Sequence, residues 1–170
     1  MLYGLSKALD WAENTFALIG GALLVFSMFS IAAEVISRYF FNYSLIWVNE
    51  ISEYILLYIP FTGAAWLLRQ KGHVTVDLID QFLSERMKVL NNVFISLIGL
   101  FVSGILIWYG FTTMMDILAR DIRSLSVLQI PQAYVIVIIP LGSLLMFLEF
   151  TRMLYRSVSA TKEQSHTVSM

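Results

Sequence analysis

Residues 45–60, LIWVNEISEYILLYIP, decide how many times this chain can cross a membrane. The stretch is apolar, yet Glu50 and Glu53 lie three positions apart and share one face of any helix formed here. The charge-free run between Glu53 and Arg69 has 15 residues. At ~1.5 Å per residue it is shorter than the roughly 30 Å hydrocarbon core of a bilayer. A spanning helix must therefore begin near Leu45 and include both carboxylates.

The rest of the chain supplies three further spans. Of the 170 residues, 58% are hydrophobic and only 14% are charged, whereas about a quarter are charged in a soluble domain. Residues 14–33, 89–115 and 124–148 contain no Asp, Glu, Lys or Arg, and each run is long enough to cross a bilayer. The sequence therefore predicts an all-α integral membrane protein with four transmembrane helices. We place these spans at about residues 14–37, 45–68, 89–115 and 131–150.

The polar segment between the second and third spans has helical periodicity. Its apolar residues recur at spacings of three and four, with charged and polar residues between them. This pattern predicts one amphipathic interfacial helix over about residues 74–88, lying on the bilayer surface. We assign Arg69, His73 and Asp77 to this helix and its approach, and expect His73 to pair with Asp77 one turn later. Residues 1–156 are predicted to form a single membrane domain, followed by a polar C-terminal tail over residues 157–170.

Basic residues are divided unevenly between the two sides of a four-span chain. The side with both termini and the segment 70–88 holds eight Lys and Arg residues, and the other side holds three. The positive-inside rule therefore predicts that both termini and the interfacial helix are cytoplasmic. The net charge is −1 and no basic run is present, which argues against nucleic acid as a partner.

Charged residues at the outer ends of the first two spans form a candidate polar layer. Glu34 and Arg38 have the i,i+4 spacing of an ion pair, and Arg38 can approach the start of the second span. The structural interpretation is a layer of Glu34, Arg38, Glu50 and Glu53 that a partner protein completes. The alternative is a proton or sodium relay, which transporters build from membrane carboxylates. The pattern favours structure, because the last two spans offer no acidic group or histidine near the midplane.

The outer loop between the last two spans is longer than helix packing requires. Its charges make it a candidate docking surface for an extracytoplasmic protein, with an ordinary solvated loop as the alternative. The residues are Asp116, Arg120, Asp121 and Arg123. The two histidines cannot complete a zinc site, cysteine is absent, and no nucleophile motif or phosphate loop occurs. The sequence therefore predicts no enzyme activity, no metal and no cofactor.

The region from the end of the first span to the interfacial helix resembles a known family. Residues 37–79 read SRYFFNYSLIWVNEISEYILLYIPFTGAAWLLRQKGHVTVDLI, which is similar to the signature region of the small, DctQ-like membrane subunit of tripartite ATP-independent periplasmic (TRAP) transporters. The matching residues are Arg38, Tyr39, Trp47, Glu50, Gly63, Ala64, Ala65, Arg69, His73, Val74, Val76 and Asp77. The later IPQAYVIVIIPLGSLLM, residues 130–146, resembles the last span of the family. One departure is Asn49, where the family pattern places an acidic residue beside Glu50.

The resemblance implies a subunit rather than a complete transporter. In such systems a periplasmic substrate-binding protein captures an organic acid, such as sialic acid or a C4-dicarboxylate, and passes it to a membrane complex. The large membrane subunit carries the substrate and sodium sites, and the small subunit is a scaffold for its static part. The resemblance thus implies a heterodimer with the large subunit, transient contact with the periplasmic protein, contact with membrane lipids, and a bacterial inner-membrane location.

Two other functions stay open. A stand-alone proton-coupled exporter, acting as a homodimer through Glu50 or Glu53, would need a carboxylate near the bilayer midplane. A membrane anchor or assembly factor without transport activity is the third possibility. The shallow position of both glutamates and the interfacial helix favour the TRAP subunit, and the residues leave its substrate open.

Overall fold

The structure, a computed structural model, describes residues 2–80, 85–124 and 126–167. Its helices are α1 (Leu2–Phe41), α2 (Ile46–Asp80), α3 (Glu85–Ala119), α4 (Gln132–Ile136) and α5 (Ile138–Thr167). Within these residues, four segments are long and apolar enough to cross a membrane. They are Ser6–Phe41, Ile46–Gln70, Val89–Ala119 and Gln132–Val158. The prediction of an all-α protein with four transmembrane helices is confirmed.

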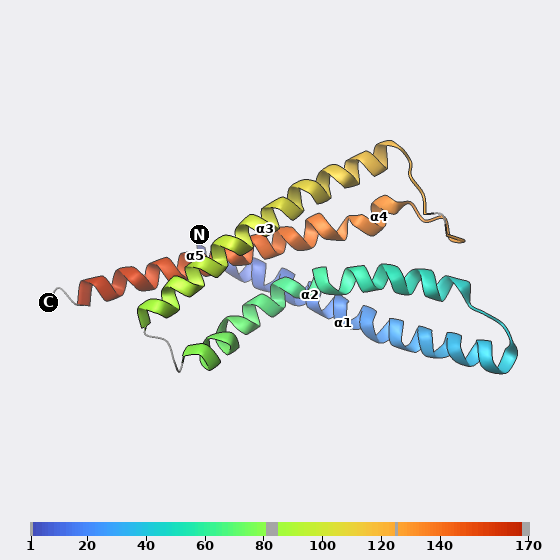
Figure 1. The fold of residues 1–170 in the computed structure, drawn as a ribbon, viewed down its shortest axis with the longest axis horizontal. Helices are drawn as coiled ribbons and strands as arrows, with labels where there is room; N and C mark the ends of the chain where they lie inside the picture. The colour runs from blue at the N-terminus through green and yellow to red at the C-terminus, as the bar shows by residue number, and fades with distance from the viewer. Residues whose placement is uncertain (1, 81–84, 125, 168–170) are drawn as a thin grey trace.

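The four long helices pack as two pairs. α1 lies beside α2, and α3 lies along α5 (Figure 1). Contacts between α2 and α5 join the two pairs, and the N-terminal part of α1 reaches α5 through an ion pair of Asp10 with Arg152. Large apolar side chains such as Phe29 and Phe101 are exposed on the outside, as expected for surfaces that face lipid. The interior combines apolar residues such as Val48 and Ile138 with small polar residues such as Ser96, Ser103 and Ser143.

Glycine allows α5 to pack closely against both α2 and α3. A Cβ atom on Gly142 of α5 would lie 2.6 Å from the carbonyl oxygen of Phe61 in α2. A Cβ atom on Gly99 of α3 would lie 2.3 Å from the ring of Phe150 in α5. Neither position has room for a side chain. These contacts fix α5 between α2 and α3.

The last span is interrupted near its outer end. α4 ends at Ile136, Val137 separates the two helices, and α5 begins at Ile138. Pro140 has no N–H to donate to the carbonyl of residue 136, and its ring crowds that carbonyl. Proline thus accounts for the break between α4 and α5, whereas α2 continues through Pro60.

The segment predicted as an interfacial helix is divided between two elements. Residues 74–80 continue α2 to Asp80, residues 81–84 lie outside the described residues, and residues 85–88 begin α3. A separate helix on the bilayer surface stays a prediction. The polar C-terminal tail continues α5 as helix as far as Thr167.

Candidate functional site

Glu50 lies one turn after the start of α2 and binds the outer loop. Its carboxylate oxygens accept the backbone N–H of Val127 at 2.7 Å and of Leu128 at 3.0 Å. The residue is 8% exposed. Hydrogen bonds to an ionised acceptor are roughly twice as strong as those between neutral groups. Glu50 therefore anchors the loop to the second span.

Two tyrosines extend the anchor along the same face of α2. Tyr54 and Tyr58 follow Glu50 at intervals of four residues, so all three lie above one another on the helix. The Tyr54 hydroxyl lies 3.4 Å from the Ser126 hydroxyl, and the Tyr58 hydroxyl donates to the backbone carbonyl of Tyr134. This row, Glu50, Tyr54 and Tyr58, which we call the α2 anchor row, binds both the loop and the start of the last span.

The anchored loop has its own backbone hydrogen bonds. The N–H of Ser124 donates to the carbonyl of Ile130 at 3.0 Å, and the N–H of Gln132 donates to the carbonyl of Ile122 at 3.1 Å. An isolated antiparallel bridge joins Arg123 to Pro131 at the base of the loop. The loop is therefore a folded hairpin-like segment whose tip is bound by Glu50.

The four predicted docking residues lie at the outer end of α3 and at the base of this loop. Arg120 binds Asp116 at 2.9 Å, and Arg123 lies 3.5 Å from Asp121. All four side chains are more than half exposed. They form two adjacent, exposed ion pairs, each with one acidic and one basic residue. The loop beside them is bound to α2 by Glu50.

Three of the four residues of the predicted polar layer make contacts among the described residues, and they do so in two separate places. Glu34 of α1 is buried, lies 3.5 Å from Arg38, and accepts a hydrogen bond from the hydroxyl of Ser44. Glu50 binds the loop instead. Glu53 is exposed, and the described part of the chain provides no hydrogen-bond or ion-pair partner for it. A layer shared by all four stays a prediction.

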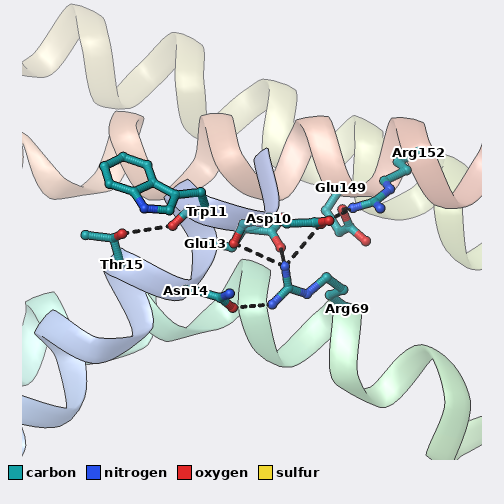
Figure 2. A network of polar contacts seen from close by, with 8 residues as sticks. All are labelled: Asp10, Trp11, Glu13, Asn14, Thr15, Arg69, Glu149 and Arg152. Atoms are coloured by element: carbon teal, nitrogen blue, oxygen red, sulfur yellow. Dashed lines mark hydrogen bonds and ion pairs between the residues drawn. The ribbon is translucent and has the colours of Figure 1, made fainter. Parts of the chain in front are cut away.

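A cluster of ion pairs joins three helices at the other end of the bundle (Figure 2). The Arg69 guanidinium of α2 lies 3.1 Å from Asp10 and 3.1 Å from Glu13, both on α1. The same guanidinium donates to the side chain of Asn14. Arg152 of α5 binds Asp10 at 2.5 Å and lies 3.5 Å from Glu149. Asp10 is thus held between an arginine of α2 and an arginine of α5.

Burial makes this cluster sensitive to the loss of any one of its partners. Glu13 is fully buried, and the Glu149 side chain is 5% exposed, while each arginine side chain is 19% exposed. Glu13 is near Arg69 but has no well-aligned hydrogen bond among the described residues, so its attraction to Arg69 is mainly coulombic. Removing one partner of a buried ion pair typically costs about 3–5 kcal/mol, because the other charge is left uncompensated.

Spacing within single helices did not predict this cluster, because most of its ion pairs join different helices. The positions of the charged residues at the ends of the spans could have predicted it. Glu13, Arg69 and Glu149 each border a charge-free run, on the side of the membrane that holds the termini. In a four-span chain such residues come together at one end of the bundle. The sequence places Arg69 at the approach of the interfacial helix, and in the structure it lies in α2 with its guanidinium against α1. The side chains of His73 and Asp77 lie outside the described residues, so their pairing stays a prediction.

Comparison with known proteins identifies the family. A curated protein named "Sialic acid TRAP transporter permease protein SiaT", from Haemophilus influenzae (strain 86-028NP), is 26% identical over 98 residues. The match covers 58% of this chain and 16% of that protein, so this chain corresponds to a small part of its relative. A family model described as "Tripartite ATP-independent periplasmic transporters, DctQ component" matches residues 27–160, which include the α2 anchor row and its loop. The chain, a multi-pass membrane protein, belongs to the DctQ-component family of tripartite ATP-independent periplasmic transporters.

Proposed function

We propose that this chain is a scaffold subunit that braces the large membrane subunit of a TRAP transporter and presents its outer loop to a periplasmic substrate-binding protein. The assembled transporter takes up an organic acid, such as sialic acid or a C4-dicarboxylate, together with sodium ions. It lies in the bacterial inner membrane, with both termini in the cytoplasm.

The contact of Glu50 with the outer loop carries the scaffold proposal. A coupling carboxylate must bind and release an ion or a proton during each transport cycle. Both oxygens of Glu50 instead accept backbone N–H groups of residues 127 and 128. Releasing them would leave two donors without their partner and free the loop. Glu50 therefore serves to position the loop.

The buried ion-pair cluster supports the same proposal. It joins α1, α2 and α5 through interlocked pairs, and the glycine contacts fix α5 against α2 and α3. A bundle held in this way at one end and through its middle suits a rigid support better than an element that changes shape with each substrate. The moving part of the transporter is then the large subunit.

The similarity to the sialic acid permease supports the proposed large-subunit partner, and it also suggests which substrate to test first. That protein is called a permease and extends far beyond the region similar to this chain, which covers 16% of it. We infer that the rest of the permease corresponds to the large membrane subunit with which this chain works. Its printed name refers to sialic acid, so we propose sialic acid as the first candidate, with C4-dicarboxylates second.

Reconstitution tests the proposed function. Liposomes are prepared with this chain alone, with the large subunit alone, and with both, and the periplasmic protein is added outside. Uptake of radiolabelled sialic acid or succinate is then measured under an inward sodium gradient, with potassium as the control. We expect uptake only when both membrane subunits, the periplasmic protein and sodium are present. Transport by this chain alone, in either direction, would contradict the scaffold proposal and favour the stand-alone exporter.

A further inference from the structure

Glu53 is an exposed carboxylate inside the second span, Ile46–Gln70. That span has 25 residues and measures about 37 Å, a few ångströms longer than a hydrocarbon core at each end. Glu53 is about 10 Å from the start of the helix and so about 7 Å inside the hydrocarbon. Charged groups at such depth face protein or water and are paired. Since the residues that the structure describes provide no partner for Glu53, this surface is unsuited to lipid.

The exposed face that carries Glu53 runs along most of the span. Its members are all exposed and recur at intervals of three, four or seven residues, which places them on one face of α2. They are Asn49, Glu53, Leu56, Pro60 and Leu67. An unpaired charge and an apolar surface thus occupy the same side of the helix.

The lower part of this face forms one wall of an open groove between α1 and α2. The groove has a volume of about 780 Å³ and is lined from α2 by Pro60, Gly63 and Leu67, and from α1 by Leu18 and Gly21. A Cβ atom on Gly21 or Gly63 would meet nothing within 4 Å. The neighbouring Gly20, in contrast, is packed against Thr62. Gly21 and Gly63 therefore leave backbone open to a molecule that enters the groove from outside.

We infer that the α1–α2 face, defined by Glu53, Pro60, Gly63, Leu67 and Gly21, binds a transmembrane helix of the large membrane subunit. This helix places a Lys or Arg side chain opposite Glu53. The inference rests on the proposed function, because that function supplies a partner within the membrane. The inference goes beyond the proposed function because it names the face that binds the large subunit. It also specifies a positive charge for the partner residue opposite Glu53.

Charge decides between this occupant and two others. A lipid chain can fill the apolar groove, but it leaves the Glu53 carboxylate uncompensated within the hydrocarbon. A second copy of this chain, packed through the same face about a two-fold axis, would bring two Glu53 carboxylates toward one another. A partner helix with a basic residue compensates the charge and fills the groove at once.

Copurification tests the inference. The tagged chain is coexpressed with the large subunit of its own system, and binding of the large subunit is measured in lipid nanodiscs. We expect Glu53→Gln to weaken the affinity about 30-fold or more, as for the loss of one partner from a desolvated charge pair. Gly63→Leu fills the groove and should abolish binding. Ala33→Leu, a change at an exposed position outside this face, is the control and should bind as wild type does.

The outcomes separate the inference from the proposed function. Every variant is first isolated alone, where an unchanged melting temperature shows that the chain itself is folded. If wild type fails to bind the large subunit, the proposed function is wrong. If wild type binds and both Glu53→Gln and Gly63→Leu bind equally well, the inference is wrong while the proposed function stands. The inference is also wrong if Gly63→Leu only displaces a bound lipid, seen by native mass spectrometry, or if Leu67→Cys forms a disulfide with a second copy of this chain.

Discussion

The carboxylate of Glu50 accepts the backbone N–H of Val127 at 2.7 Å, across 77 positions of sequence. One side chain of the second span thus determines where the tip of the outer loop lies. One of the two carboxylates considered as an ion-coupling group therefore accepts hydrogen bonds from the backbone.

Loss of the charge at Glu50 should loosen the loop. In Glu50→Gln one acceptor oxygen is replaced by an NH₂ group, which faces a backbone donor and cannot accept from it. We expect the amide protons of Val127 and Leu128 to exchange with solvent roughly tenfold faster. Hydrogen exchange of the purified chain measures this. Glu53→Gln is the matched control and should leave both amides protected, while equal exchange in all three proteins would contradict the anchor.

Loss of Arg69 should destabilise the whole bundle. Arg69→Gln leaves Glu13 buried without its cation and removes the bond to Asp10. We expect the free energy of unfolding to fall by about 3–5 kcal/mol. The control is Arg120→Gln, which breaks an exposed i,i+4 pair worth about 0–1 kcal/mol. Unfolding in mild detergent compares the two variants. A similar loss of unfolding free energy in both would contradict the claim that the ion-pair cluster stabilises the bundle.

A methyl group at Gly142 should separate α5 from α2. The new Cβ atom of Gly142→Ala would lie 2.6 Å from the carbonyl oxygen of Phe61, and overpacking of this kind costs about 1–3 kcal/mol. Gly63→Ala is the control because its Cβ atom meets nothing within 4 Å. We expect a lower melting temperature for Gly142→Ala only. No difference between the two would mean that the helices are not in close contact there.

Thiol labelling tests the predicted orientation, and the chain contains no cysteine of its own. Arg123→Cys lies by the outer loop, and Lys7→Cys lies near the N-terminus. In intact cells an impermeant maleimide should label Arg123→Cys, and it should label Lys7→Cys only after the inner membrane is permeabilised. The reverse pattern would invert the topology.

The four spans could be predicted because charge-free runs of sufficient length are a local property of the sequence. The partner of Glu50 could not, since it consists of backbone N–H groups whose position depends on how a distant loop folds. Arg69 binds Asp10 and Glu13, which lie more than fifty positions earlier in the chain. Predicting these pairs requires knowing which helix ends lie side by side. The exposure of Glu53, three positions from a buried carboxylate on the same helix, likewise depends on packing that spacing alone does not contain.

The central claim is that this chain supports transport without carrying the coupling ion, and sodium dependence tests it most directly. Sodium-driven uptake is measured for the reconstituted complex with wild type and with Glu50→Gln, over a range of sodium and of periplasmic-protein concentrations. We predict an unchanged sodium concentration for half-maximal uptake, with lower uptake at limiting periplasmic protein that recovers as the protein reaches saturation. An intact complex with Glu50→Gln that binds the periplasmic protein normally, yet shows no sodium-driven uptake at any concentration, would contradict the account.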